Sequence, residues 1–411
     1  MVALAARTIG GALRSAADRA PPGRSFERDG AGRRGDGERR ACRGGIGMSL
    51  ESIVSGTRAA AGLFDMDTRG LLEVSGADRV RWLDGMISGD VKALEKAGPG
   101  SGCQAMLLTN RGAIIADLHV GYRGDVFHLE SLRSAIPRIQ AALERLLIAD
   151  EVELRDRSDE FAALGLEGPR ATSILHRAAS GGFGGLERES WALVEVEGRE
   201  VLVAAFGFSG ESAYQLRMRP EDRLVVEAAL EDAGAGSGLV RGDSEALEVL
   251  RVEAGIPLLG AELDEDVLPA EARLEAAIAN DKGCYVGQEI VARLRARGQV
   301  RHLLVGLRLE TSDLPPPGTN LSADGRITGE LTSVVRSPDQ GPIALGFVRR
   351  EHAEPGTLVR LEEAGGAESG TGVARVVELP FVAPTRDGTT DETGSGSSRV
   401  GREALPVRDP S

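Results

Sequence analysis

The chain has 411 residues, which is long enough for two or three domains with hydrophobic cores of their own. Its 41% hydrophobic and 27% charged residues are typical of a soluble globular protein, and no apolar run approaches the ~18 residues that cross a bilayer. Three cysteines without a Cys-x-x-Cys pair argue against a disulfide framework. They favour a reducing compartment, so we expect a cytoplasmic protein without membrane contact.

The net charge of −14 is unevenly distributed along the chain. Ten arginines stand against five acids in residues 1–47 and four against five in residues 381–411, which leaves −18 on residues 48–380. Because phosphate binding needs clustered cations, a body this acidic argues against direct nucleic-acid binding.

Both ends of the chain are predicted to be disordered. Residues 1–47 are rich in Arg and Gly and poor in large apolar side chains, so burial cannot offset the entropy of ordering them. The five acids in this stretch argue against an organellar transit peptide, and a true start at Met48 is an equally good explanation. Residues 381–411 have the Gly/Ser-rich composition of a flexible linker.

Hydrophobic periodicity predicts mixed helices and strands in the body of the chain. A strand at 70–75 is followed by a helix that Ser75 caps, in which Val80, Leu83 and Ile87 share one face. In chain order we predict strands at 70–75, 105–108, 113–120 and 126–129, a helix at 136–146, strands at 191–196, 200–206 and 213–218, and helices near 221–233 and 243–254.

After Arg301 the pattern changes to short strands separated by Pro- and Gly-containing turns, which is typical of a small β-barrel. The fold class is therefore α+β followed by β. We divide the chain into a disordered extension over 1–47, an α+β module of two interleaved subdomains over 48–300, a barrel over 301–380 and a disordered tail over 381–411.

Residues 282–289, here called the cysteine motif, read Lys-Gly-Cys-Tyr-Val-Gly-Gln-Glu. They gather residue types that are rare in this chain, which has three lysines, three cysteines and three tyrosines. A neighbouring cation favours the reactive thiolate, so Lys282 beside Cys284 predicts an activated thiol. The alternative is a tight turn with an inert, buried Cys284 and with Tyr285 used for packing.

Metal and nucleotide sites are not indicated. The five histidines, at 119, 128, 176, 302 and 352, show no ligand spacing, so no metal site is expected. An iron–sulfur cluster usually needs three or four cysteines, and only Cys284 is a good candidate. The chain also lacks a Walker-type phosphate loop.

A series of motifs resembles, in order, the folate-binding YgfZ/GcvT superfamily over roughly residues 50–380. The cysteine motif resembles the signature of the YgfZ branch, whereas the glycine-cleavage T-protein branch has a related glycine loop without the cysteine. The other matching segments are 63–65, 69–70, 74–78, 112–117, 207–211 and 250–255.

The resemblance implies three domains arranged as a cloverleaf around a central channel that holds tetrahydrofolate or a one-carbon derivative, with a β-barrel as the third domain. In the T-protein branch the folate accepts a one-carbon unit from an aminomethyl group on lipoate, and ammonia is released. In the YgfZ branch the implied role is folate-dependent assembly or repair of iron–sulfur enzymes, including tRNA-modifying ones, with iron–sulfur proteins or their assembly factors as partners.

Three positions depart from the T-protein pattern. Two adjacent aspartates are replaced by Ala116 and Asp117, a pterin-binding glutamate by Gln215, and an arginine by Leu247. An amide matches only half of the pterin edge that a carboxylate can bind. Because losing a charged partner costs about 1.5–3 kcal/mol, these changes disfavour aminomethyl transfer by the T-protein scheme.

Eight candidate site residues follow from the motifs and the resemblance. Catalytic roles are assigned to Cys284, to Lys282 as its activator, and to Asp117 for proton handling. A solvated or ion-paired helix face is the alternative for Arg251, and a turn is the alternative for Glu211. The expected cofactor-binding residues are Asp117, Glu211, Tyr214, Gln215, Arg251 and Tyr285.

Three functions fit the sequence. We favour a tetrahydrofolate-binding factor in iron–sulfur assembly or repair, with its chemistry at Cys284. The first alternative is a folate-dependent aminomethyltransferase or other one-carbon transferase, which needs Asp117. The second alternative is a noncatalytic module that senses folate and docks partners. Whether the protein is an enzyme is left open by the sequence.

Overall fold

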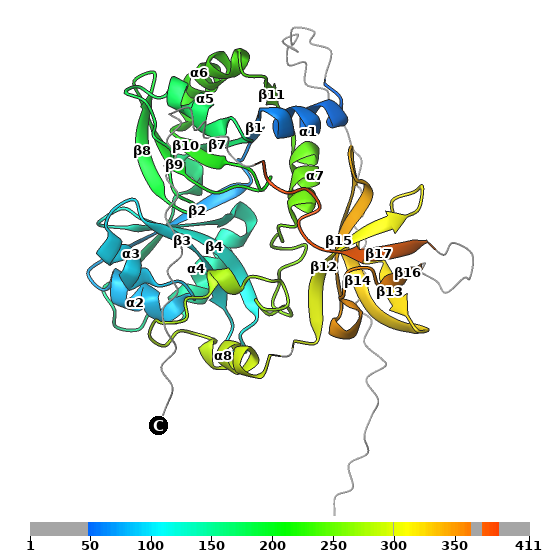
Figure 1. The fold of residues 1–411 in the computed structure, drawn as a ribbon. Helices are drawn as coiled ribbons and strands as arrows, with labels where there is room; N and C mark the ends of the chain where they lie inside the picture. The colour runs from blue at the N-terminus through cyan, green and yellow to red at the C-terminus, as the bar shows by residue number, and fades with distance from the viewer. Residues whose placement is uncertain (1–47, 299, 363–371, 386–411) are drawn as a thin grey trace, which may run out of the picture. The chain divides into compact units, whose positions relative to one another are not determined.

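The computed structural model describes residues 48–298, 300–362 and 372–385 (Figure 1). They form a five-stranded sheet, a six-stranded sheet and a closed six-stranded barrel, with helices packed on both sheets. The predicted α+β fold with a C-terminal barrel is confirmed. The stretches expected to be disordered, 1–47 and most of 381–411, lie outside the described residues. Within the described part, no helix is long and apolar enough to cross a membrane.

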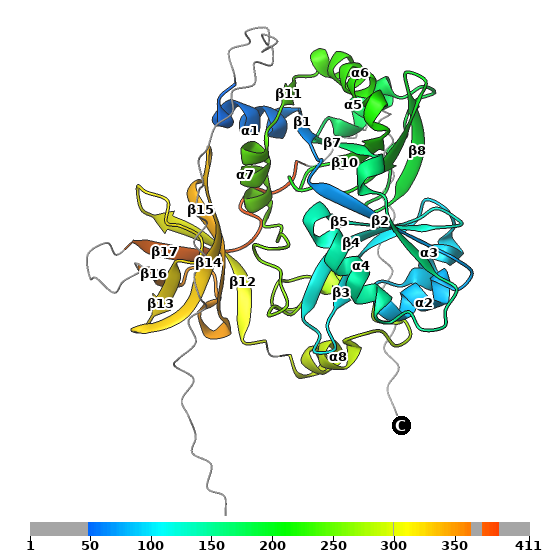
Figure 2. The same ribbon diagram turned by 180° about the vertical axis from the view of Figure 1, so that it is seen from behind.

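The five-stranded sheet is antiparallel throughout, in the order β3-β4-β5-β2-β6. Side chains alternate between its faces, so Leu118 and Val120 of β4 point to one side and Asp117 and His119 to the other. Helices α2, α3 and α4 cover the apolar face, as Figure 2 shows from behind. The bounds are β2 Arg69–Ser75, α2 Arg79–Met86, α3 Val91–Ala97, β3 Gly102–Leu108, β4 Ile114–Tyr122, β5 Phe127–Leu132, α4 Ile136–Glu144 and β6 Glu153–Asp156.

The six-stranded sheet has the order β11-β1-β7-β10-β9-β8, with a parallel pair only at β11-β1. One face packs on α5 and α6 through Ile174, Leu175, Val226 and Leu230. The bounds are α1 Leu50–Ala59, β1 Ala61–Asp65, β7 Ala162–Glu167, α5 Ala171–Ala178, β8 Trp191–Val196, β9 Arg199–Ala204, β10 Ala213–Met218, α6 Arg223–Ala235, β11 Leu239–Arg241 and α7 Ser244–Ala254.

The two faces that helices leave uncovered meet each other. A buried ion pair joins Glu130 of β5 to Arg217 of β10, with 3.0 Å between Oε1 and Nη2. The approach is close at Gly121, where an added Cβ would lie 2.4 Å from the Trp191 ring. Only glycine fits there, because any larger residue would push the sheets apart. This contact brings polar side chains of both sheets into one buried layer.

The C-terminal barrel closes in the order β12-β15-β14-β13-β16-β17 around its own apolar core. Helix α7 ties it to the rest of the body, because Arg251 bonds Ser333 and Glu253 bonds Ser337 of β14. The bounds are α8 Gln288–Arg297, which precedes the barrel, and β12 His302–Glu310, β13 Asn320–Ala323, β14 Arg326–Ser337, β15 Gly341–Arg349, β16 Leu358–Glu362 and β17 Val373–Val377.

The local predictions hold for most elements but fail at one helix start. Ser75 ends β2, and α2 begins at Arg79 after Asp78, whose side chain makes no capping bond. Strand β7 was not indicated by the sequence because all six of its residues are buried, which removes the alternation that marks a half-exposed strand.

Candidate functional site

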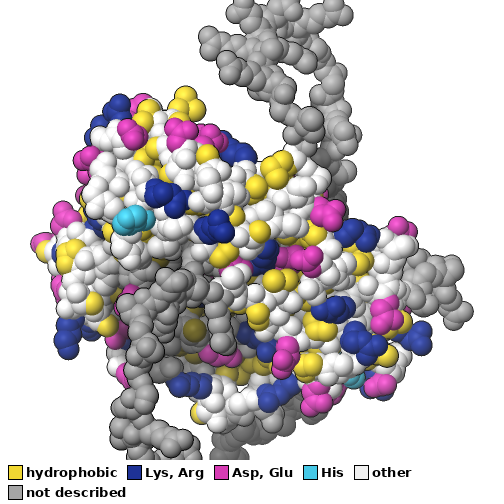
Figure 3. All heavy atoms as spheres, turned by 45° about the horizontal axis from the view of Figure 1, so that its top comes forward, with side chains coloured by type: hydrophobic (Ala, Val, Ile, Leu, Met, Phe, Trp, Pro, Cys, Tyr) yellow, Lys and Arg dark blue, Asp and Glu magenta, His cyan; other side chains and the backbone are white. Residues whose placement is uncertain are grey.

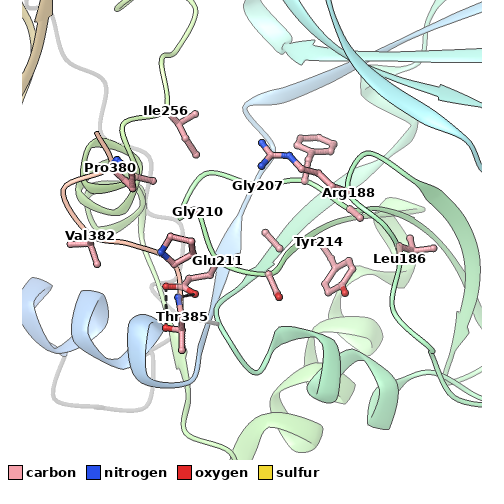
Figure 4. A pocket seen from close by; sticks show the side chains of 16 residues that line it. Leu186, Arg188, Gly207, Gly210, Glu211, Tyr214, Ile256, Pro380, Val382 and Thr385 are labelled. Carbon is pink, nitrogen blue, oxygen red and sulfur yellow. Dashed lines mark hydrogen bonds between the residues drawn. The ribbon is translucent and has the colours of Figure 1, made fainter. Parts of the chain in front are cut away.

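A cavity of about 660 Å³ opens beside residues 205–212, which connect β9 to β10; we call it the β9–β10 cavity (Figure 4). Glu211 and Thr385 lie on one side of it, and Tyr214 and Leu186 on the other. Its lining comprises Leu186, Arg188, Ala205, Phe206, Gly207, Gly210, Glu211, Ser212, Ala213, Tyr214, Ala254, Ile256, Pro380, Val382, Pro384 and Thr385.

Glu211 is held in place by two parts of the chain that are distant in sequence. Its carboxylate pairs with Arg58 of α1 at 3.1 Å and accepts a hydrogen bond from the backbone N–H of Thr385 at 2.9 Å. Gly210 precedes it with φ of +79°, a conformation that favours glycine. Glu211 therefore links α1, the cavity rim and the segment that follows the barrel.

Glu167, the last residue of β7, holds the loop of residues 205–212 in place, and no sequence pattern indicated it. Its fully buried carboxylate accepts hydrogen bonds from the backbone N–H groups of Phe208 and Ser209. Burial raises the pKa of Glu167 above its ordinary value, and the hydrogen bonds from Ser209 oppose that change. A buried carboxylate at the end of an all-buried strand gives no distinctive sequence pattern.

Tyr214 and Gln215 point to opposite faces of β10. The hydroxyl of Tyr214 lies 2.8 Å from that of Thr172 on α5, and its ring lines the cavity. Gln215 is buried on the face that meets the five-stranded sheet, where Nε2 donates to the Phe206 carbonyl at 3.4 Å. Its Oε1 accepts no hydrogen bond from the described residues.

Asp117 reaches the same layer from β4. It is buried, and its Oδ1 accepts no hydrogen bond from the described residues. Two positions along on the same face, His119 stacks on Phe206 with ring centroids 3.6 Å apart, and Phe206 lines the cavity. Asp117 and Gln215 thus present unpartnered oxygens on the two sheet faces that meet, although neither residue lines the cavity.

Arg251 is fully engaged within the protein. Its five N–H groups donate to Glu248 twice, to Glu262, to the Ile256 carbonyl and to Ser333. Because a guanidinium has five donors, none is left for a ligand. The ion-paired alternative describes this geometry, although the side chain is buried rather than solvated.

Lys282 lies in a pocket of backbone carbonyls. Its ammonium donates to the carbonyls of Asp84, Ile87 and Gly89, and it lies 3.3 Å from the Asp84 carboxylate. Burial lowers the pKa of Lys282, and the charge of Asp84 opposes that change. All three N–H groups are used, so no donor is available to stabilise a thiolate at Cys284.

The other two candidate site residues of the cysteine motif, Cys284 and Tyr285, differ in exposure. Cys284 is exposed, whereas the Tyr285 ring is buried in the core of the five-stranded sheet with Lys282 Nζ 5.3 Å from its centroid. Burial also raises the pKa of Tyr285. Neither residue lines the β9–β10 cavity, and neither does Lys282.

Figure 3 draws one face of the molecule with its side chains coloured by type. Basic and acidic side chains are interspersed there over the described residues, without one continuous basic patch. The fold and cavity together define an α+β protein with a C-terminal barrel and a cavity beside the loop that joins β9 to β10.

Comparison with known proteins agrees with that class. Residues 49–282 match the GCVT N-terminal domain and residues 303–382 the glycine cleavage T-protein C-terminal barrel domain. The chain therefore belongs to the GCVT aminomethyltransferase family. This family uses tetrahydrofolate, which confirms the expected cofactor at the level of the family.

Relatives of similar length are named aminomethyltransferase. "Aminomethyltransferase" of Saccharopolyspora erythraea is 33% identical over 79% of this chain and 87% of that protein. "Aminomethyltransferase" of Bacillus subtilis is 29% identical over 81% of this chain and 91% of that protein. The crystal structure of glycine cleavage system aminomethyltransferase T from Bartonella henselae shares the fold, with a TM-score of 0.72 and 24% identity over 81% of this chain and 89% of that one.

These relatives correct the preferred functional prediction. A role in iron–sulfur assembly or repair is contradicted, because the relatives at about a third identity are named for aminomethyl transfer. The prediction gave most weight to an activated Cys284, but Lys282 has no free donor for it. The transferase alternative is the better supported one.

Proposed function

We propose that this chain is a tetrahydrofolate-dependent one-carbon transferase of the aminomethyltransferase type, with the β9–β10 cavity as its folate site. The observation that carries the proposal is the contact of Phe206, which lines this cavity, with the buried layer: its ring stacks on His119 and its carbonyl accepts from Gln215. The same layer holds the unpartnered oxygens of Asp117 and Gln215. Ligand sites typically occupy about 300–1,000 Å³ and combine an apolar lining with a few polar groups, as this cavity does.

Asp117 is the proposed proton-handling residue. Its Oδ1 is buried without a hydrogen-bond donor among the described residues, and such an atom is costly unless a ligand supplies the donor. A folate N–H or ammonium group would do so. In the proposed reaction two folate nitrogens attack the carbon of a carrier-bound aminomethyl group in turn. The carbon–nitrogen bond breaks to release ammonia, the carbon–sulfur bond breaks to release the carrier's thiol, and Asp117 takes a proton from a folate nitrogen and passes it to a leaving group.

The assay for this proposal uses the full-length protein with an aminomethyl-loaded lipoyl carrier protein and tetrahydrofolate. We expect release of ammonia and methylenetetrahydrofolate, and a fall of about 10²-fold or more in Asp117→Asn. Asp125→Asn, at an exposed turn, is the matched control and should be unchanged. No turnover above background by the wild type would reject the proposal, and folate binding without turnover would favour the noncatalytic folate-sensing alternative.

Gln215 provides a second test of where the folate binds. A carboxylate at this position can accept two hydrogen bonds from a pterin edge, whereas the amide accepts at one atom only. Gln215→Glu is therefore expected to tighten tetrahydrofolate binding by about tenfold or more in calorimetric titration. Unchanged affinity would place the pterin away from Gln215.

Within the family, we infer membership of the YgfZ branch from the cysteine motif alone. In this fold the motif leads into α8, and its Gly287 takes φ of +83° with the Thr109 carbonyl 2.6 Å from an added Cβ. Gly287 therefore tolerates no side chain. We propose that the motif positions α8 against β3 and that Cys284 is not required for one-carbon transfer.

A further inference from the structure

A second cavity, of about 380 Å³, lies where the turn before β5 meets β8, β9 and β10; we call it the arginine cavity. Arg217 lines this cavity and also belongs to the buried layer between the sheets. It lies four residues along β10 from Ala213, which lines the β9–β10 cavity. The lining residues are Arg123, His128, Phe161, Leu193, Gly198, Arg199, Glu200, Leu202, Arg217, Arg219 and Asp222.

Four of these residues are arginines and two are carboxylates, although the body of the chain is strongly acidic. Asp222 is already paired with Arg199 at 3.3 Å. Among the described residues, Arg123 and Arg219 form no ion pair. Glu200 is the one other carboxylate in the lining, so these two arginines outnumber it. The cavity therefore carries excess positive charge.

Buried behind this cavity, two guanidinium groups share one carboxylate. Arg69 Nε donates to Glu130 Oε1 at 3.2 Å, and Arg217 Nε donates to Oε2 at 3.3 Å. Arg217 and Arg69 are each 2% exposed, and Glu130 is fully buried. Two cations against one anion leave a net positive charge in a place where desolvation makes it costly.

The terminal nitrogens of both guanidinium groups still lack acceptors. Nη1 and Nη2 of Arg69 and of Arg217 make no hydrogen bond with the described residues, although Arg217 Nη2 lies 3.0 Å from Glu130 Oε1. A buried donor without an acceptor costs the full desolvation of that group. Of the two, Arg217 lines the cavity and can offer its donors to a molecule inside it.

We propose that the arginine cavity binds a small organic oxyanion, with Arg217, Arg123 and Arg219 as its ligands. The planar guanidinium fork binds the two oxygens of a carboxylate or phosphate in parallel, which is the chemistry these residues share. Phe161, Leu193 and Leu202 form an apolar wall for a short carbon chain. The bound anion supplies the acceptors that Arg217 lacks and offsets the buried positive charge.

The test is calorimetric titration of the full-length protein at low ionic strength with inorganic phosphate and, separately, with glutarate. Saturable binding of glutarate alone assigns a carboxylate ligand, and saturable binding of phosphate alone assigns a phosphate ester. Arg123→Gln and Arg219→Gln should each weaken binding by about tenfold or more. Neither change leaves a buried carboxylate unpaired, so both variants should fold, which a thermal melt checks.

Arg326→Gln is the matched control, because Arg326 is exposed on β14 of the barrel and forms no ion pair among the described residues. It should bind like the wild type. The proposal fails if neither probe binds saturably, if Arg123→Gln and Arg219→Gln bind normally, or if Arg326→Gln loses as much affinity as they do. One-carbon transfer should be unchanged in Arg123→Gln and Arg219→Gln, so this test is independent of the proposed function.

Discussion

The imidazole of His119 lies flat on the phenyl ring of Phe206, with their planes only 6° from parallel. His119 belongs to the five-stranded sheet, and Phe206 follows the last residue of β9 in the six-stranded one. His119 Nδ1 also lies 2.8 Å from a Glu189 carboxylate oxygen. This stack and the hydrogen bond from His119 to Glu189 fix the wall of the β9–β10 cavity to the neighbouring sheet, so the cavity depends on how closely the sheets pack.

The spacing of the sheets can be altered at Gly121. Gly121→Ala places a Cβ 2.4 Å from the rigid Trp191 ring and should lower the free energy of unfolding by about 1–3 kcal/mol, measured by urea denaturation. Because Trp191 packs near Phe206, tetrahydrofolate binding should weaken as well. Gly85→Ala is the control: nothing lies within 4 Å of the added Cβ, and the α2 helix should gain about 0.5–1 kcal/mol. Equal effects of the two changes would contradict this account.

Lys282 is predicted to act through stability rather than through catalysis. Lys282→Met leaves three carbonyls without their donor, and the only cation left beside Asp84 among the described residues is the exposed Lys92, at 3.0 Å. Breaking a buried pair of this kind costs roughly 3 kcal/mol of unfolding free energy, measurable by chemical denaturation. Lys96→Met, at an exposed position on α3, should cost almost nothing. A fully stable Lys282→Met variant with lost activity would restore a chemical role.

Thiol labelling separates Cys284 from Cys103. Cys103 is only partly exposed, and burial raises its pKa to about 12, with the charge of Glu189 adding to that effect, so it stays protonated at pH 8. Cys284 is exposed. In a Cys42→Ser background, a disulfide reagent should label one thiol quickly and a second much more slowly than it does in the unfolded protein, and Cys284→Ser should remove the fast phase. Rapid labelling that survives in Cys284→Ser would show that Cys103 is accessible.

The free energy of unfolding should decrease as the pH is lowered below about 6.5, because of His128. Burial lowers the pKa of His128, whereas hydrogen bonding to Glu73 opposes the change. The folded state then binds fewer protons than the unfolded state, so the stability present above the unfolded pKa is lost as the pH falls. The loss is up to about 1.4 kcal/mol per pH unit. Urea denaturation at pH 7.5, 6.5 and 5.5 should show a shallower dependence in His128→Gln, and identical slopes would exclude His128 as the cause.

The sequence by itself determined the fold class and the family. The apolar run over 113–120 and the change to short strands after Arg301 are local patterns, and they appear as β4 and the barrel. Asp117, Glu211, Tyr214 and Gln215 were found because they lie in contiguous motifs. Asp117, Tyr214 and Gln215 lie on strands and Glu211 on the loop before β10, but only Glu211 and Tyr214 line the β9–β10 cavity.

Only the tertiary structure decided which side chains were available for chemistry. Lys282 and Arg251 carry charge next to functional motifs, but other parts of the chain use up their donors. The carbonyls that bind Lys282 are 193 to 198 residues away, and Arg251 bonds Ser333 of the barrel as well as the nearby Glu248 and Glu262. The same holds for Glu130, whose two arginines lie 61 and 87 residues away. Packing between distant segments decides which hydrogen-bond partners each side chain has. The amino-acid sequence read along the chain therefore does not show which donors remain free.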